Sequence, residues 1–432
     1  MIKILQVRNI DSFVESRRQK TSEKDRKTVQ SILNDVRKNG DSAVKKYERK
    51  FNGRKTSQLR VSAKEIKEAK SKIRRQESRA IRTAQTMLSW RESAYLSVQP
   101  AWRNRQTTRA RAMSTAAAVK RVLVPISSVG CYIPGGLARY PSSVIMSVVP
   151  ADIADVKRIV VVSPPGPDGK IDPLTIAAAK MCGATEIYKV GGAQAIGALA
   201  FGTKSIPKVD KIVGPGGKFV SIAKSLVSDQ TAIDMVAGPT ELGIVADTSS
   251  DPELVALDLI SQAEHSKDTM CFVITQSKTT AKQIQKSIEK LISTTERSSI
   301  IKESISKNGF IAVCKNQNEM IELANKIAPE HLELMVKNAK SLSKKITGAG
   351  LLLIGKNTPS AASDYLLGTN HILPTNGFGR TRGGLSVLDF LKLQTVVESD
   401  KSTLRKISKS LKLLTDAEDL PNHYKAVKRR LD

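Results

Sequence analysis

Residues 157–190 have the sequence KRIVVVSPPGPDGKIDPLTIAAAKMCGATEIYKV, in which two apolar runs flank a helical pattern. The runs at 157–165 and 186–190 predict buried strands, because short apolar segments bounded by turn residues are typical of covered sheets. Asp172 predicts the N-cap of the intervening helix, with Pro173 in its first turn. A strand, a helix and a second strand in this order predict a parallel β-α-β unit.

The alternation of predicted strands and helices continues downstream, with a helix at 193–202, a strand at 209–215 and a helix at 218–228. A second set begins at the apolar run ELGIVAD (241–247). It continues with a helical segment at 251–265 and apolar runs at 269–276, 309–314 and 350–355. Two such sets predict an α/β fold with two doubly wound Rossmann-like parallel-sheet domains. Small helical N- and C-terminal segments are expected, because residues 1–120 and the tail after Gly384 are polar, basic and mainly helical in pattern.

The predicted domain boundaries follow these changes in composition and in strand and helix pattern. We expect residues 1–30 to form an N-terminal arm and residues 31–127 with 237–380 to form the first, discontinuous Rossmann-like domain. Residues 128–236 are expected to form the second Rossmann-like domain, and residues 381–432 a small C-terminal helical domain. The chain of 432 residues is long enough for this many units.

The charge balance is strongly basic, with 70 Lys and Arg against 41 Asp and Glu, and a net charge of +29. A nucleic-acid binder gathers such charge on one face and adds aromatic side chains for stacking. Here the excess is spread along the chain and aromatic residues make up only 4%. The pattern indicates a basic surface that attracts anionic ligands, including a dinucleotide, rather than a dedicated nucleic-acid site.

The four cysteines are far apart and form no CxxC pair, which argues against a thiolate metal site and predicts small core residues in a reducing compartment. No pattern of a signal peptide opens the sequence, and no apolar run has the length of a membrane span. We therefore expect a cytoplasmic protein.

Only four histidines occur, and each lies in a polar context. Gln262 and His265, in SQAEHS, fall on one face of a helix end, where they could bind a cation or form an ordinary capped terminus. Glu330 and His331, in APEHLEL, are expected at a helix start after Pro329. There they could supply a water-orienting carboxylate and an imidazole base, or simply a solvated first turn.

Two further acid and histidine pairs lie nearer the C-terminus. Asp364 and His371 fall in a loop-rich segment between two prolines, a setting that indicates a site more than a core. Glu418 and His423 lie in a segment that is equally consistent with a plain basic helix.

Three glycine-rich stretches could receive a cofactor, although a full G-x-G-x-x-G pattern is absent. They are VGCYIPGG (129–136), VGGAQAIG (190–197) and GPGGKF (214–219). Each could bring a phosphate or nicotinamide close to backbone N–H groups at a helix start, or could be a tight turn.

The order and the residue sequences of these motifs together indicate a family more specifically than any single motif does. From about residue 30 to the C-terminus the chain resembles histidinol dehydrogenase. The similar strings, in order, are VGCYIPGG, ARYPSSVIM, VGGAQAIGALAFGT, VDKIVGPGG, AIDMVAGPTE, DLISQAEH, APEHLEL, SDYLLGTNHILPT and RGGLSVLDF.

The resemblance implies one Zn²⁺ per subunit, bound by Gln262, His265, Asp364 and His423. It implies that Glu330 and His331 are the acid–base pair. The implied substrate-binding set comprises Thr240, Gln262, His265, His331, Asp364, His371, Glu418 and His423.

The resemblance also implies NAD contacts at Tyr132, Gln194 and Gly217, and a homodimer whose C-terminal segment completes the partner's site. The expected reaction is oxidation of L-histidinol through L-histidinal to L-histidine with two NAD⁺, the last steps of histidine biosynthesis. Two positions depart from the family pattern: Gly217 replaces an Asn that contacts the cofactor, and Thr240 replaces a Ser. The alternatives are a related zinc and NAD dehydrogenase for another small hydroxyl compound, or a non-catalytic basic protein that binds nucleic acid.

Overall fold

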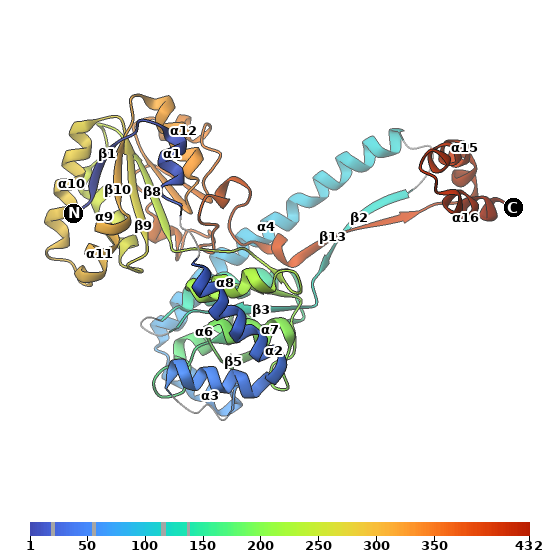
Figure 1. Ribbon diagram of the computed structural model, residues 1–432, viewed down its shortest axis with the longest axis horizontal. Helices are drawn as coiled ribbons and strands as arrows, with labels where there is room; N and C mark the ends of the chain where they lie inside the picture. Colours follow the sequence, from blue (N-terminus) through green and yellow to red (C-terminus); the bar gives the residue numbers. More distant parts are fainter. Residues whose placement is uncertain (19–21, 54–57, 114–117, 136–138) are drawn as a thin grey trace.

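The computed structural model describes residues 1–18, 22–53, 58–113, 118–135 and 139–432, and contains two parallel sheets and a projecting arm (Figure 1). The six-stranded sheet has the order β1-β10-β9-β8-β11-β12, and every neighbouring pair is parallel. Its strands are β1 (Lys3–Gln6), β8 (Glu241–Ala246), β9 (Met270–Thr275), β10 (Phe310–Val313), β11 (His331–Met335) and β12 (Leu351–Ile354).

The five-stranded sheet has the order β5-β4-β3-β6-β7 and is also parallel throughout. Its strands are β3 (Ser128–Tyr132), β4 (Arg158–Ser163), β5 (Glu186–Lys189), β6 (Lys211–Val213) and β7 (Ala232–Ile233). The chain winds outward from β3 to β5 and then returns to the other side of β3 at β6. A reversal of winding between two parallel strands opens a crevice at their carboxyl ends, where such folds bind ligands.

Helices cover both faces of each sheet, as the apolar character of the strands requires. On the six-stranded sheet, one face carries α9 (Pro252–Ala263), α10 (Lys278–Ile292) and α11 (Ser298–Asn308). The other face carries α1 (Ile10–Glu15), α12 (Gln317–Ile327) and α13 (Ala339–Ser343). On the five-stranded sheet, α2 (Glu23–Asn52), α7 (Gly192–Phe201) and α8 (Lys218–Val227) cover one face. The opposite face carries α3 (Ala63–Lys72), α4 (Arg75–Met113), α5 (Pro141–Ile153) and α6 (Pro173–Met181). The predicted fold class is confirmed.

The N-terminal elements are distributed differently from the predicted domain boundaries. Helices α2, α3 and α4 pack on the five-stranded sheet, through α7, α6 and α5, and not on the sheet formed by residues 237–380. The apolar side chains of Val29, Leu33 and Val36 on α2 provide the reason, because they join the core of that sheet. Strand β1, in the predicted N-terminal arm, instead pairs with β10 at the edge of the six-stranded sheet.

A long arm projects from the two sheets and carries the C-terminal helices at its tip (Figure 1). Strand β2 (Ala118–Pro125) pairs antiparallel with β13 (Leu391–Glu398) beside α4, and α15 (Lys401–Ala417) and α16 (Pro421–Leu431) follow. The prediction of a helical tail is right for α15 and α16 and wrong for β13. Pairing with β2, distant in the sequence, creates this strand, and the local pattern does not reveal it.

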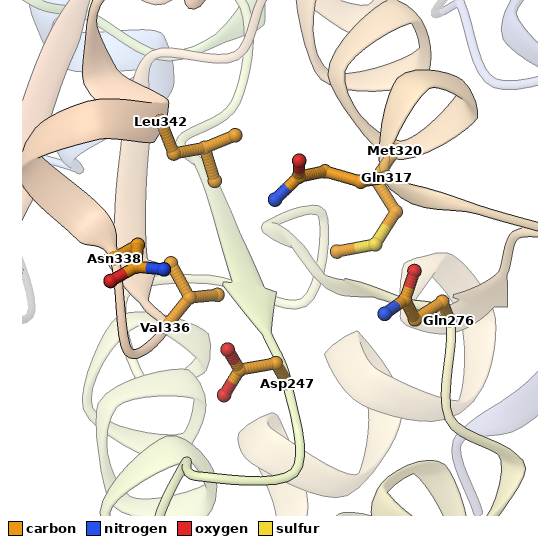
Figure 2. Close-up of a pocket in the computed structure, with 7 residues that line it drawn as sticks. All are labelled: Asp247, Gln276, Gln317, Met320, Val336, Asn338 and Leu342. Atoms are coloured by element: carbon orange, nitrogen blue, oxygen red, sulfur yellow. The ribbon is translucent and has the colours of Figure 1, made fainter.

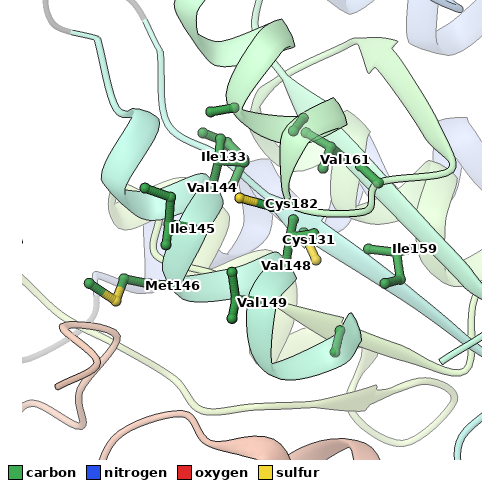
Figure 3. Packing of buried hydrophobic residues seen from close by; sticks show 14 of the residues in the cluster. Cys131, Ile133, Val144, Ile145, Met146, Val148, Val149, Ile159, Val161 and Cys182 are labelled. Carbon is green, nitrogen blue, oxygen red and sulfur yellow. The ribbon is translucent and has the colours of Figure 1, made fainter. Parts of the chain in front are cut away.

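The cysteines are buried among aliphatic side chains, as predicted. Cys131 and Cys182 lie in the core between the five-stranded sheet and α5 and α6, beside Val144 and Val161 (Figure 3). Burial raises the pKa of Cys182 to about 12, so this thiol stays protonated and unreactive. None of the helices in the described ranges combines the length and apolar character needed to cross a bilayer.

Candidate active site

Most of the predicted catalytic and metal-binding residues gather at the amino edge of the six-stranded sheet. Thr240 precedes β8, Glu330 precedes β11, and His331 is the first residue of β11, in register with Leu242 of β8. Helix α9 runs antiparallel to these strands, so its end, with Gln262 and His265, reaches the same edge. The site therefore lies opposite the carboxyl edge at which doubly wound sheets usually bind ligands.

His331, Asp364 and His371 form a hydrogen-bonded group at this edge. Nε2 of His331 donates to Asp364 Oδ1 at 3.2 Å, and Nδ1 of His371 donates to the Asp364 carbonyl at 2.9 Å. Burial opposes a charge on His331, yet Asp364 and Glu330 raise the pKa of this imidazole to about 9. Burial also opposes a charge on Asp364, but the His331 ring keeps the pKa of that carboxyl below its usual value. In this arrangement the two groups are an ion pair.

Glu330 is held by a reciprocal pair of bonds to Glu241, the first residue of β8. The Glu241 N–H donates to Glu330 Oε2 at 2.9 Å, and the Glu330 N–H donates to Glu241 Oε2 at 3.3 Å. Both side chains are buried, and burial raises the pKa of Glu330 to about 8 and that of Glu241 to about 7. A carboxyl whose pKa is close to the working pH is suited to general acid–base chemistry.

The motif APEHLEL begins a strand, not the helix that the sequence suggests. Helix α12 ends at Ile327, Ala328 adopts a left-handed conformation with φ 50°, and β11 starts at His331. The segment pairs with β8 on one side and β12 on the other, and this pairing decides its conformation. Both Glu330 and His331 lie at the amino end of β11, and their access to one cleft stays a prediction.

The end of α9 presents two possible ligands for a cation. Nδ1 of His265 donates to the Gln262 carbonyl at 3.1 Å, which orients the ring and directs Nε2 away from its own helix. Helix α14 (Ser360–Ser363), whose C-cap is Asp364, packs against α9. Gln262 is buried and His265 is exposed. The described residues contain no group of three His, Cys, Asp or Glu side chains placed to bind a metal ion.

The predicted NAD contacts lie at the carboxyl edge of the five-stranded sheet. Tyr132 ends β3, and its hydroxyl accepts from the Gly192 N–H at the start of α7 at 3.1 Å. Gln194, in the first turn of α7, donates through Nε2 to Glu48 at 2.8 Å. Its carbonyl oxygen is buried and has no hydrogen-bond partner among the described residues, so it can accept from a ligand.

The GPGG loop lies beside Tyr132 at the point where the winding reverses. Gly214 has φ 111°, and a Cβ there would lie 2.2 Å from the Tyr132 carbonyl oxygen, so only glycine fits. A buried ion pair fixes the loop: Lys224 contacts Asp234 and donates to the Gly214 carbonyl at 2.9 Å. Gly217 is the N-cap of α8, which makes the N–H groups of that helix start available to an anion. Of the stretch 129–136, Gly136 lies outside the described residues.

Glu418 and His423 do not join the rest of the site within one chain. Both are exposed, and the helices that carry them lie at the tip of the arm (Figure 1). Glu418 is the C-cap of α15, and His423 lies on α16. The arm exposes apolar side chains: Leu393, Val397 and Leu413 are 54%, 60% and 65% exposed. An exposed apolar surface of this kind is typical of a protein–protein contact.

The carboxyl edge of the six-stranded sheet contains a small cavity of about 60 Å³. Figure 2 shows its lining by Asp247, Gln276, Gln317, Met320, Val336, Asn338 and Leu342. This volume holds a few water molecules and is far below the several hundred Å³ of a cofactor pocket.

Three residues that the sequence does not single out support the site. Glu241 bonds to Glu330, Glu48 bonds to Gln194, and the Ser143 hydroxyl lies 3.4 Å from His371 Nε2. For Glu241 a signal is present, because an acidic residue at the start of a fully buried strand needs an internal partner. Glu48 and Ser143 lie on helices without a distinctive local pattern, so only the fold reveals them.

Comparison with known proteins agrees with this geometry. The family model described as histidinol dehydrogenase matches residues 15–431. The histidinol dehydrogenase of Methanococcus maripaludis is 42% identical over 94% of this chain and 93% of its own. That of Methanocaldococcus jannaschii is 40% identical over 94% and 92%.

A solved structure extends the agreement to three dimensions. The crystal structure of histidinol dehydrogenase from Elizabethkingia anophelis superimposes with a TM-score of 0.88 at 32% identity, covering 100% of this chain and 98% of that one. Neither a nucleic-acid-binding role nor a different small hydroxyl substrate is favoured by these findings. The chain belongs to the histidinol dehydrogenase family.

Proposed function

We propose that this chain oxidises L-histidinol through L-histidinal to L-histidine, with two NAD⁺ in succession and with zinc. As a member of its family the chain is an oxidoreductase of histidine biosynthesis. The observation that carries the finer proposal is the group at the amino edge of the six-stranded sheet. There an imidazole, two carboxyls and a further histidine lie within hydrogen-bond or charge contact of one another.

The acid–base roles follow from the two groups at the start of β11. His331 would take the hydroxyl proton while hydride passes to the nicotinamide, and would act again as base on the hydrated aldehyde. Glu330 would activate the water that hydrates the aldehyde, a role that suits a buried carboxylate with a raised pKa. Thr240 and His371 border the same edge and would bind substrate.

The donor set at the end of α9 is consistent with zinc, which takes imidazole nitrogen and oxygen ligands. Gln262, His265 and Asp364 would be three ligands, and the hydrogen bond that His265 Nδ1 donates to the Gln262 carbonyl fixes the ring in the orientation a ligand needs. His423 of the partner subunit would be the fourth. A zinc ion bound here would anchor the imidazole and amine of the substrate. Because it would neutralise part of the Asp364 charge that stabilises protonated His331, it would also lower the pKa of His331.

The cofactor proposal rests on the crevice between β3 and β6. Tyr132 ends β3, and Gly217 is the N-cap of α8, which follows β6. Gln194 lies at the start of α7, which follows β5, and α7 begins beside the Tyr132 hydroxyl. Together with the N–H groups at the start of α8, they would bind one NAD⁺ at a time. The basic surface of the chain would raise the local concentration of this anion.

The test of the function is direct. Purified protein with NAD⁺ and L-histidinol should produce NADH, followed by absorbance, and activity should fall on chelation and return with added zinc. Activity on simple primary alcohols at the same rate, or full activity after complete removal of metal, would contradict the proposal.

Gly217→Asn is expected to lower the KM for NAD⁺ with little change in kcat, because the amide would contact the cofactor equally in ground and transition states. The position accepts a side chain: its φ is −66°, and a Cβ added there would have no other atom within 4 Å. Gly217→Ala is the matched control, since it adds Cβ without the amide. An unchanged KM in both variants would mean that the backbone already makes the contact.

The proposed dimer predicts that two inactive variants complement each other. His331→Asn and His423→Ala should each be inactive alone, but in a mixed dimer one site contains the parental His331 and the partner's parental His423. After subunit exchange the mixture should recover about one quarter of parental activity, as random pairing requires. Mass spectrometry of differently tagged chains would verify that subunits have exchanged. A mixture that stays inactive after verified exchange would mean that no residue crosses between subunits.

A further inference from the structure

Three separate elements carry the proposed zinc ligands and the proposed base. Helix α9 carries Gln262 and is followed by His265, β11 begins with His331, and α14 (Ser360–Ser363) ends at its C-cap, Asp364. Metal sites and acid–base pairs require these elements to keep a fixed spacing. Glu333, in the middle of β11 on the same face as His331, contacts both of the other elements.

One oxygen of Glu333 holds the start of α14. Oε1 accepts from the Ser360 N–H at 2.7 Å, and the Glu333 side chain is 2% exposed. The Asp364 N–H in turn donates to the Ser360 carbonyl at 3.0 Å, so Asp364 lies one helical turn from the anchored residue. A shift of the start of α14 would therefore carry Asp364 with it.

The other oxygen of Glu333, Oε2, is buried and receives no hydrogen bond from the described residues. The Glu333 side chain also lies in hydrogen-bond contact with the side chain of Asp258 on α9. Two carboxyls can hydrogen-bond only if one carries a proton, and a protonated Oε2 that donates to Asp258 accounts for both facts. Burial, reinforced by the Asp258 charge, raises the pKa of Glu333 to about 8, in agreement with a protonated Glu333.

Asp258 places the contact on the face of α9 that carries the ligands. It lies four residues before Gln262 and seven before His265, so the three side chains project from one side of the helix end. A bond from Glu333 to Asp258 therefore fixes the position of that face relative to β11.

We propose that Glu333 and Asp258 share one proton in a positioning pair that ties α9, β11 and α14 together and sets the spacing of the proposed zinc ligands. This inference rests on the proposed function, because it assigns a task toward the zinc ion. The pair touches neither substrate nor metal. Groups that orient metal ligands in this way typically contribute about 10–100-fold to metal affinity.

The experiment compares Glu333→Gln with Glu333→Leu. Gln keeps both bonds, because its carbonyl oxygen accepts from the Ser360 N–H and its amide nitrogen donates to Asp258. Leu has a similar size and makes neither bond. Zinc affinity of the metal-free full-length protein, measured by competition with a chromophoric chelator, should fall about 10–100-fold for Glu333→Leu and stay close to the parent for Glu333→Gln.

Ile288→Ala is the matched control for lost stability. Ile288 is buried on α10 in the same core and is not one of the proposed site residues. Its variant should lower the Tm without weakening zinc binding. If Glu333→Leu also keeps parental zinc affinity and kcat while its Tm falls, the pair is merely structural and the inference is wrong.

A parent that binds no zinc would instead overturn the metal part of the proposed function. The inference would still be decided by kinetics, because Asp364 also orients His331. In that case kcat for histidinol oxidation should fall for Glu333→Leu and be preserved in Glu333→Gln, and equal kcat values would refute it.

Discussion

Asn in place of His331 is expected to slow oxidation of both histidinol and histidinal by about 10²–10⁴-fold, the usual effect of removing a general base. The same imidazole is proposed to take a proton in each step, so the oxidation rates of both substrates should fall. The Asn amide occupies the position of the imidazole Nδ1, so the variant also loses the hydrogen bond from Nε2 to Asp364. Single-turnover NADH formation, measured separately with each substrate, checks the expectation, and nearly parental rates would remove His331 as the base.

Glu330→Gln provides the comparison that separates the two acid–base roles. If Glu330 activates water only, the variant should lose most of its histidinal oxidation and keep a larger share of the first hydride transfer. The carboxyl must be deprotonated to act as base, and burial raises its pKa to about 8. Parental histidinal oxidation should therefore rise with pH through about 8, and the variant should lack the contribution of Glu330 to that rise. Equal losses on both substrates would refute the division of labour.

His265→Ala and Asp364→Ala are each expected to abolish zinc binding and turnover, because either change opens the coordination sphere. Asp364→Ala also removes the hydrogen-bond acceptor of His331. Elemental analysis of the dialysed variants, with the NADH assay beside it, gives both readouts. Glu264→Ala, at the same helix end but outside the proposed ligand set, is the matched control and should keep its metal. Full zinc in both ligand variants would exclude these two residues as ligands.

Much of the fold is predictable because burial on both faces leaves a clear pattern. The run KRIVVVSPP forms β4 at Arg158–Ser163, and Asp172 caps α6 by accepting from Leu174 N–H and Thr175 N–H. Strand β13 is not predictable in this way, since seven of its eight residues are exposed and only pairing with β2 defines it. The APEHLEL segment forms a strand where a helix is predicted, because its short apolar pattern does not distinguish a helix start from a buried strand.

The candidate site is predictable only in part, for a similar reason. The family resemblance supplies the individual residues, and the fold brings Glu330, His331, Asp364 and His371 together. No local pattern shows that Glu241 holds Glu330, or that a second acid lies beside Glu333, because these contacts join residues far apart in the sequence. Supporting contacts of this kind depend on the order of strands in the sheet.

The antiparallel ribbon of the arm also sets an order of events during synthesis. Strand β2 is made early, whereas β13 follows almost the whole of both sheets. During translation the elements of the five-stranded sheet are complete long before β2 can find its partner. Closing so long a loop makes the ribbon a late step of folding. The arm therefore forms near the end of biosynthesis, so newly made chains pass through a stage in which both sheets are folded and the ribbon is still open.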